Sequence, residues 1–394
     1  MTFGMGVSFF IASRLKFGGR IAGICIAVSF LVMIIAVAVS SGFRREIRDG
    51  LSAVSGDVRI TPADMNFLSE DSYMERRPAY LAHVEALPGV DEVVPVIYRA
   101  GIVRSGENIH GVMIKGVPYA DDDDSDGLGV SVPSRLASML GLKEGDALTT
   151  YFVGEKVKVR KFRVESIYTG VAETDDKMIV LAGMKTLQRL NGWDEDMVSA
   201  MEIRLSDRMR DVGGMEYMEK EIGYAAYLWG DEDETPVVAS SAVRMYPQLF
   251  DWLGLIDFNV LFILVLMTIV AGFNMISGLL IMLFENISTI GLLKAVGMTD
   301  RAIAKVFLLR ASSSVLKGMA AGNAAALALC AFQSVTHAVR LDPSNYFVSF
   351  VPVHADILRI LAADAVSYAV IMALLVIPCT FISRVDPAKT LVVK

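Results

Sequence analysis

The chain has 394 residues, 54% of them apolar, and a mean hydropathy of +0.49. This composition is too apolar for an ordinary soluble protein and too mixed for a chain made only of membrane spans. The formal net charge is −7, and the sequence has no stripe of Lys and Arg with aromatic residues between them, so we expect no nucleic-acid partner. The three cysteines, Cys25, Cys330 and Cys379, fall in apolar runs, which excludes a disulfide framework for the middle of the chain.

Four apolar runs are long enough to cross a bilayer as helices, which takes roughly 20 residues. They cover residues 21–41, 255–284, 306–335 and 357–382. The first run contains "AVA" at positions 36–38, which resembles a signal-peptide cleavage site, but its apolar core is longer than a signal peptide needs. We therefore expect a retained span, with a cleaved leader as the alternative.

Basic residues flank the predicted spans on one side. They are Arg14, Lys16 and Arg20 before the first span, Lys294, Arg301, Lys305 and Arg310 between the second and third, and Arg384, Lys389 and Lys394 after the fourth. The positive-inside rule then places both termini and the segment between spans two and three in the cytoplasm. Three arginines just beyond the first span oppose this orientation, but two acids offset them and a long domain follows, where the rule weakens.

The middle of the chain is then extracytoplasmic. Short strand-like runs such as "DVRIT", "VPVIY" and "KFRVESIY" alternate there with helical patches such as "SRLASMLGL". We expect an α+β domain over residues 43–253, inserted between spans one and two, with residues 1–42 before it and residues 254–394 after it. The acidic run at 120–127 is predicted to be a solvated loop; as a calcium site it lacks the EF-hand spacing.

No motif for covalent chemistry is present in the sequence. It lacks the phosphate-binding G-x-x-x-x-G-K-[ST] loop, H-E-x-x-H and G-x-S-x-G, and its four histidines are far apart. We therefore expect no catalytic residue, no metal site and no cofactor in this chain.

Polar residues inside the predicted spans are costly in lipid and need a role. Asp364, Lys317, Asn274 and Asn323 are interpreted as helix–helix hydrogen bonding or interfacial pairing, with an ion or proton pathway as the alternative. In the third span, Gly318 and Gly322 form a G-x-x-x-G spacing that lets another helix approach closely.

The segment "FENISTIGLLKAVGMTDRAIAKVF" begins at Phe284, between spans two and three. Isoleucine or leucine recurs at positions 287, 290 and 293, which gives a short helix an apolar ridge. Gly297 can adopt the left-handed conformation that ends it, and Thr299 can cap the next helix. The pattern alone fits either a helix lying on lipid headgroups or a knob inserted into a groove of a cytoplasmic protein.

This segment resembles the coupling helix of the FtsX/MacB-like superfamily of ABC permeases, with its variants of "EIGILKALGAS". Further stretches resemble the lipoprotein-releasing, LolC/LolE-type branch in the same order: "SFFIASRL" at Ser8, "SGFRREIRDGLSAVSGDVRI" at Ser41, "AGFNMISGLLIMLFE" at Ala271, "LDPSNYFVSFVPV" at Leu341 and "ISRVDPAKTL" at Ile382. Two positions depart from the branch: Thr289 stands where many members carry Glu, and Asp175-Asp176 stands where "YD" is frequent.

The resemblance implies a multi-pass permease subunit of the bacterial inner membrane that extracts lipoproteins from the lipid bilayer and passes them to a periplasmic carrier. Its expected partners are two copies of a separate ABC ATPase, which would bind ATP and Mg, and a second permease, either itself or a paralogue. The expected ATPase-coupling residues, within a coupling helix at 285–299, are Glu285, Ile287, Ile290, Gly291, Leu293, Lys294, Gly297 and Met298, with Ile290, Leu293 and Lys294 as main contacts. A lipid cavity along spans one and two is expected at Phe30, Ile34, Val37, Phe43, Phe258, Phe262 and Asn274.

Three other functions stay open at this point. A MacB-like export permease shares the four-span plan but normally carries its own fused ATPase. A non-transporting, FtsX-like mechanotransmitter usually has a shorter outer domain. A secondary transporter would use Asp364 and Lys317.

Overall fold

The computed structural model describes residues 20–106, 108–118, 128–154, 156–168, 178–342, 346 and 348–384. The acidic run at 120–127, Asp175-Asp176 and the sequence before residue 20 lie outside these described residues. The chain forms two compact units: one contains Met1–Arg45, Leu253–Leu341 and Phe350–Lys394, and the other contains Glu46–Trp252 and Asp342–Ser349.

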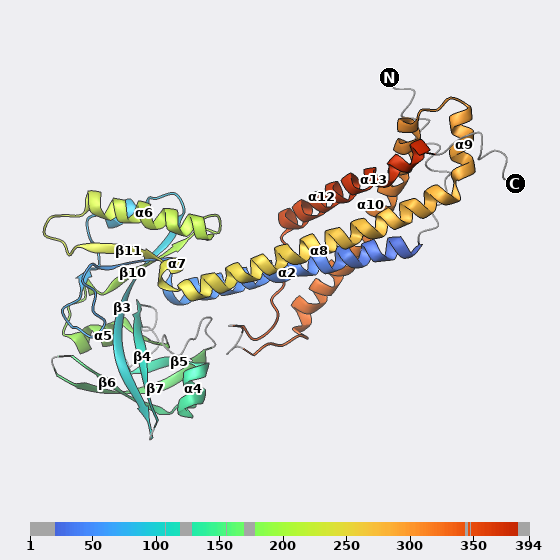
Figure 1. The fold of residues 1–394 in the computed structure, drawn as a ribbon. Helices are drawn as coiled ribbons and strands as arrows, with labels where there is room; N and C mark the ends of the chain where they lie inside the picture. Colours follow the sequence, from blue (N-terminus) through green and yellow to red (C-terminus); the bar gives the residue numbers. More distant parts are fainter. Residues whose placement is uncertain are drawn as a thin grey trace. The chain divides into compact units, whose positions relative to one another are not determined.

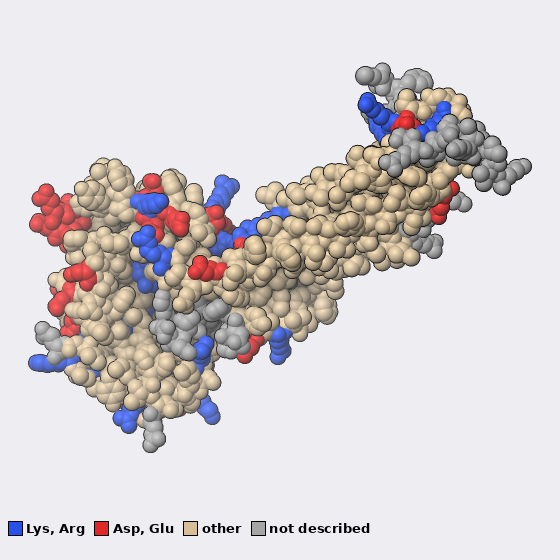
Figure 2. Space-filling view, in the orientation of Figure 1, with Lys and Arg blue, Asp and Glu red and all other residues tan. Residues whose placement is uncertain are grey.

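Among the described residues, four helices are long and apolar enough to cross a membrane, as the sequence predicted (Figure 1). They are α2 (Arg20–Ser55), α8 (Pro247–Glu285), α10 (Asp300–Thr336) and α12 (Ile357–Leu374), the last continued by α13 (Val376–Cys379) and the 3₁₀ turn η2 (Thr380–Arg384). On the face in view, Figure 2 shows almost no charged side chain along the middle of these helices. Such a surface suits a hydrocarbon environment.

Helix α2 does not end with the predicted span at residue 41 but continues to Ser55. Phe43, Ile47 and Leu51 are buried and recur every four residues, so one face of the helix stays apolar beyond the span. Gly56, with φ +69°, ends the helix in the left-handed conformation. A hydropathy window misses this extension because Arg44, Arg45 and Arg48 lower its mean.

Helices α2 and α10 approach closely through glycine. An added Cβ at Gly318 would lie 2.7 Å from Ile26 Cγ2, and one at Gly322 would lie 2.9 Å from Phe30 Cβ. The G-x-x-x-G spacing therefore acts as predicted, since side chains larger than hydrogen would separate the two backbones. Around this contact, buried residues of α2, α8, α10 and α12 form the helical core.

The α+β unit is built on a nine-stranded sheet with the order β11-β1-β10-β3-β4-β8-β5-β7-β6. The strands are β1 (Val58–Pro62), β3 (Val90–Ser105), β4 (Asn108–Val117), β5 (Gly129–Pro133), β6 (Ala147–Phe152), β7 (Lys158–Tyr168), β8 (Ile179–Gly183), β10 (Ala200–Leu205) and β11 (Val237–Ser241); β2 (Met74–Glu75) and β9 (Met197–Val198) pair separately. Pairing is antiparallel except between β4 and β8 and between β5 and β7. The middle of the chain is thus α+β, as its pattern indicated.

The described part of the same unit contains five helices: α3 (Leu81–Glu85), α4 (Ser134–Leu140), α5 (Met184–Asn191), α6 (Val212–Trp229) and α7 (Ala242–Met245). Helix α6 packs on β11 and β1 (Figure 1). It covers the face on which Ile60 and Ala239 lie opposite each other.

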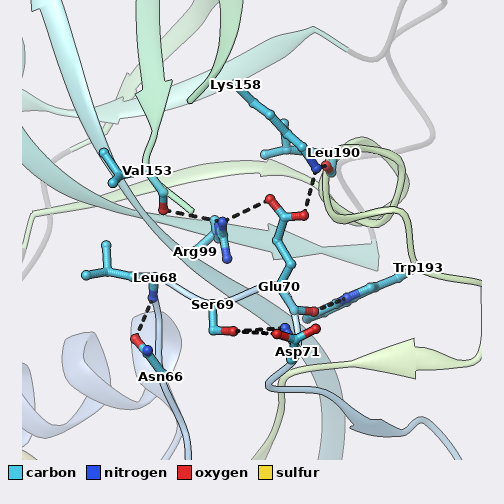
Figure 3. A network of polar contacts seen from close by, with 10 residues as sticks. All are labelled: Asn66, Leu68, Ser69, Glu70, Asp71, Arg99, Val153, Lys158, Leu190 and Trp193. Carbon is cyan, nitrogen blue, oxygen red and sulfur yellow. Dashed lines mark hydrogen bonds and ion pairs between the residues drawn. The ribbon is translucent and has the colours of Figure 1, made fainter. Parts of the chain in front are cut away.

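A loop at residues 63–73 lies against β3, where the Ala100 amide donates to the Phe67 carbonyl at 2.9 Å. Figure 3 shows the Glu70 carboxylate between Arg99, at 3.3 Å, and Lys158, at 2.9 Å. The Trp193 indole N–H donates to the Glu70 carbonyl oxygen at 2.7 Å. Arg99 is only 1% exposed, so removing this carboxylate would leave a buried charge uncompensated. The network therefore anchors the loop.

Candidate functional site

Helix α9 (Ile287–Ala295) links α8 to α10. The Asn286 side chain donates to the Met282 carbonyl at 2.8 Å where α8 ends. Gly297, with φ +92°, follows α9, and the Thr299 hydroxyl accepts from the Ala302 amide at 3.4 Å at the start of α10. The predicted roles of Gly297 as a helix terminator and Thr299 as a cap are confirmed.

The apolar ridge of α9 faces the protein core. Ile290 is 1% exposed and Gly291 is buried, while Ile287, Leu293 and Met298 are half-buried against the same cluster. Ile290 is therefore not available as an outward contact in this chain, contrary to the prediction that a partner grips it. A ridge at a spacing of three identifies an apolar face but not which neighbour covers it.

On the exposed side of this segment lie Ser288 and Leu292 of α9 and Val296 directly after the helix, each four residues from the next. Leu292 is 55% exposed and Val296 is 79% exposed. Neither residue was predicted as a contact from the sequence, because the segment is apolar on two sides and its periodicity does not distinguish one side from the other. The spacing of four residues between Leu292 and Val296 was the signal in the sequence that could have identified a second apolar side.

Lys294 binds within the chain. Its Nζ donates to the Ile382 carbonyl oxygen at 2.7 Å and lies 2.9 Å from Asp300 Oδ1. Phe284 at the end of α8 and Phe381 also form an edge-on ring pair, with centroids 5.2 Å apart. Helix α9 is thus joined to the start of α10 and to η2, whereas Glu285 is exposed.

A cavity of about 500 Å³ lies between α2, α8 and α12. Its walls are apolar, formed by side chains such as Val37, Leu261, Leu264 and Val366. Deeper in the helices, the Thr268 and Ser367 hydroxyls bond each other at 2.9 Å, which satisfies both groups. The shape and lining suit an aliphatic chain.

One end of this cavity is polar. The Ser40 hydroxyl donates to Asp257 Oδ1 at 2.8 Å, and Arg44 pairs with the same carboxylate. Ser41 is buried, and its Oγ has no hydrogen-bond partner among the described residues. Arg359 also lines the cavity. The site can therefore bind a molecule with an apolar chain and a polar group at one end.

Of the seven predicted lipid-cavity residues, all of which are described, Val37 alone lines this cavity. Phe30, Ile34 and Phe43 are buried in helix packing, Asn274 is half-buried, and Phe258 and Phe262 are exposed on α8. The prediction omitted α12, because the position of the fourth span beside the first two depends on helix packing rather than on periodicity.

Asn323 of α10 donates from Nδ2 to Asp364 Oδ2 of α12 at 2.5 Å. Lys317 is exposed. The interpretation of these intramembrane polar residues as helix–helix hydrogen bonding is confirmed for Asn323 and Asp364.

Comparisons with known proteins agree with these features. Residues 261–387 match the family model described as FtsX-like permease C-terminal. The lipoprotein-releasing system transmembrane protein LolC of Neisseria meningitidis serogroup B is 21% identical over 94% of this chain and 92% of its own length. The corresponding LolE of Haemophilus influenzae is 21% identical over 98% of this chain and 99% of its own. The resemblance to LolC/LolE-type, FtsX-like permeases is thereby confirmed.

Among solved structures, the periplasmic region of MacB from Actinobacillus actinomycetemcomitans aligns over 52% of this chain and 97% of its own length, with a TM-score of 0.31 and 11% identity.

Proposed function

We propose that this chain, which resembles LolC/LolE-type permeases over nearly its whole length, is the membrane subunit of an ABC transporter that extracts lipoproteins from the inner membrane. Its FtsX-like permease domain is part of the same premise. In this proposal a separate ATPase supplies the energy, and a periplasmic carrier receives the cargo. The observation that carries the proposal is the short helix α9 between two long ones: Leu292 on it and Val296 directly after it are exposed, while Ile290 and Lys294 hold it to the rest of the chain.

The orientation in this proposal follows the basic residues. Both termini and α9 lie in the cytoplasm, because arginine and lysine cluster near the ends of the spans on that side. The α+β unit then lies in the periplasm, where a carrier can reach it.

The ATPase contact consists of Leu292 and Val296, inserted into a groove on the ATPase. Burial of two such side chains contributes about 1.5–3 kcal/mol each, enough to couple two bodies mechanically. Lys294 does not bind the ATPase in this arrangement but holds α9 against Ile382 and Asp300, so that movement of α9 moves α10 and η2 with it. ATP and Mg bind in the partner.

The cargo explains the need for a motor. Withdrawing acyl chains from a bilayer costs about 0.8 kcal/mol per methylene, so removal of a multi-chain anchor costs on the order of tens of kcal/mol. The cavity between α2, α8 and α12 supports a role in holding one such chain while the helices move, and a second permease, identical or paralogous, completes the transporter.

The test of the coupling site is co-purification of the ATPase with the double variant Leu292→Asp, Val296→Asp. We expect loss of co-purification and of ATPase stimulation, because two apolar side chains that insert into the ATPase groove become charged. The control is Tyr227→Asp, an exposed aromatic on α6. Retention of the ATPase by the double variant would rule out this contact face.

A further inference from the structure

A cluster of charged residues lies on the face of the nine-stranded sheet opposite to α6. Cross-strand register assembles it: Arg59 of β1 pairs with Glu202 of β10 and, on its other side, with Ser240 of β11. On the neighbouring strands, Tyr98 of β3 pairs with Lys115 of β4. Residues directly opposite each other in a sheet share a face, so these side chains meet although they are far apart in the sequence.

Glu202 is the shared acceptor of the cluster. It accepts from Lys115 Nζ at 2.6 Å and from the Tyr98 hydroxyl. Lys115 Nζ also donates to the Val54 carbonyl at 2.6 Å. Burial lowers the pKa of Lys115, while Glu202 opposes that shift. Burial raises the pKa of Tyr98; Arg59 opposes this shift and Glu202 adds to it, so the hydroxyl remains a donor.

Arg59 completes the cluster and leaves it with an excess of positive charge. Its NH2 group donates to the Tyr98 hydroxyl at 2.7 Å and lies 3.8 Å from Glu202 Oε1. Two cations, Arg59 and Lys115, therefore share one carboxylate. Arg59 is 9% exposed, and within the described part of the chain its Nε has no hydrogen-bond partner. A buried cation of this kind favours a bound anion.

A cavity of about 410 Å³ lies directly against Arg59 and Tyr98. This volume is within the range of small-molecule sites, roughly 300–1,000 Å³. Its remaining lining is mostly apolar and includes Met65, Phe67, Met113, Ile179 and Met245. Arg59, Tyr98 and Ile179 are buried, whereas Met65, Phe67 and Met113 are partly exposed. Thioether side chains adapt to irregular aliphatic shapes.

The loop that supplies Met65 and Phe67 is held by the Glu70 network of Figure 3. One wall of the cavity is therefore preformed rather than assembled on binding. A preformed apolar wall beside the Arg59 guanidinium is suited in shape and charge to a ligand with an apolar part and a negative charge.

We propose that this cavity binds a carboxylate-bearing amphiphile, with its head against Arg59 and its single aliphatic chain along Met113, Ile179 and Met65. A carboxylate carries the one negative charge that the cluster lacks, and a hydrogen bond between a guanidinium and a carboxylate is stronger than one between neutral groups. The site lies in the α+β unit and does not depend on the transport proposal.

The test measures octanoate binding to the full chain in nanodiscs by titration calorimetry, with empty nanodiscs of the same lipid subtracted. We expect saturable binding that weakens about ten-fold or more in Arg59→Gln, because a charge-assisted hydrogen bond is lost. Met113→Trp fills the cavity and weakens binding similarly. The control Arg104→Gln, an exposed arginine on β3, binds as the wild type does. Octan-1-ol, which has the chain without the charge, binds about ten-fold more weakly than octanoate.

Thermal unfolding shows whether each variant is folded. If Arg59→Gln does not fold, Met113→Trp and the comparison of octanoate with octan-1-ol decide the question. Equal affinity for octanoate and octan-1-ol, unchanged octanoate affinity in folded Met113→Trp, or no saturable octanoate binding to the wild type would each overturn the proposal.

Discussion

Lys294 on α9 donates a hydrogen bond to the main-chain carbonyl of Ile382, across 2.7 Å. This bond joins the short helix between the second and third long helices to the segment that follows the fourth. Lys294, which was predicted from the sequence to contact the ATPase, therefore bonds to residues of its own chain.

Replacing Lys294 with Met removes both this hydrogen bond and the ion pair with Asp300. A hydrogen bond from a charged group contributes about 1.5–3 kcal/mol, so we expect a lower unfolding temperature in detergent and weaker stimulation of the ATPase. Co-purification of the ATPase should persist, because Leu292 and Val296 are unchanged. If Lys294→Met instead abolishes co-purification while the unfolding temperature stays the same, Lys294 contacts the ATPase directly.

Two glycines test the packing of α10 on α2. Gly318→Ala places a Cβ 2.7 Å from Ile26 Cγ2, so overpacking should destabilise the protein by about 1–3 kcal/mol. At Gly254 on α8 an added Cβ meets nothing within 4 Å, and Gly254→Ala should stabilise the helix by about 0.5–1 kcal/mol. Thermal unfolding of the two variants should therefore shift in opposite directions. A shift in the same direction would contradict the close contact.

Asp57 predicts a pH dependence of stability. Burial raises its pKa above the ordinary value of 3.8, although the Leu205 amide and Arg210 act in the opposite direction. Between 3.8 and the raised pKa the folded state binds more protons than the unfolded state, so this group's contribution to the free energy of unfolding falls as the pH rises. The Asp57→Asn variant has no titratable group at this position and so lacks this pH-dependent contribution to the free energy of unfolding. Unfolding free energies measured from about pH 4 to 7 should show the wild type losing stability relative to Asp57→Asn as pH rises, whereas parallel profiles would contradict the shift.

Asp364→Asn separates a structural role from proton transfer. An amide at this position can still accept from Asn323, so ATP-driven activity should remain close to that of the wild type. Asn323→Leu removes the bond and should cost about 1–2 kcal/mol of stability. Loss of activity in a fully folded Asp364→Asn protein would favour a proton pathway instead.

The local elements were predictable because their causes lie within a few residues. The length of the apolar runs identified the four long helices, Gly297 marked the end of α9, and Thr299 marked the start of α10. What failed depended on neighbours distant in sequence. Ile290 and Leu292 are equally apolar, and only packing against α8 and α10 decides which of them is buried. The cavity likewise requires α12 beside α2, and the Arg59 cluster requires a strand order in which β1 and β3 flank β10, which no single stretch encodes.

Release of a triacylated lipoprotein from proteoliposomes to its soluble carrier tests the transport proposal as a whole. With the partner ATPase and ATP, the wild type should release cargo, and Ala363→Trp, which fills the cavity between α2, α8 and α12, should release little while still retaining the ATPase. Ala365→Trp, at an exposed position on the same helix, should behave as the wild type. Release that proceeds without ATP, or that is equal in Ala363→Trp and the wild type, would contradict an ATPase-driven permease that works through this cavity.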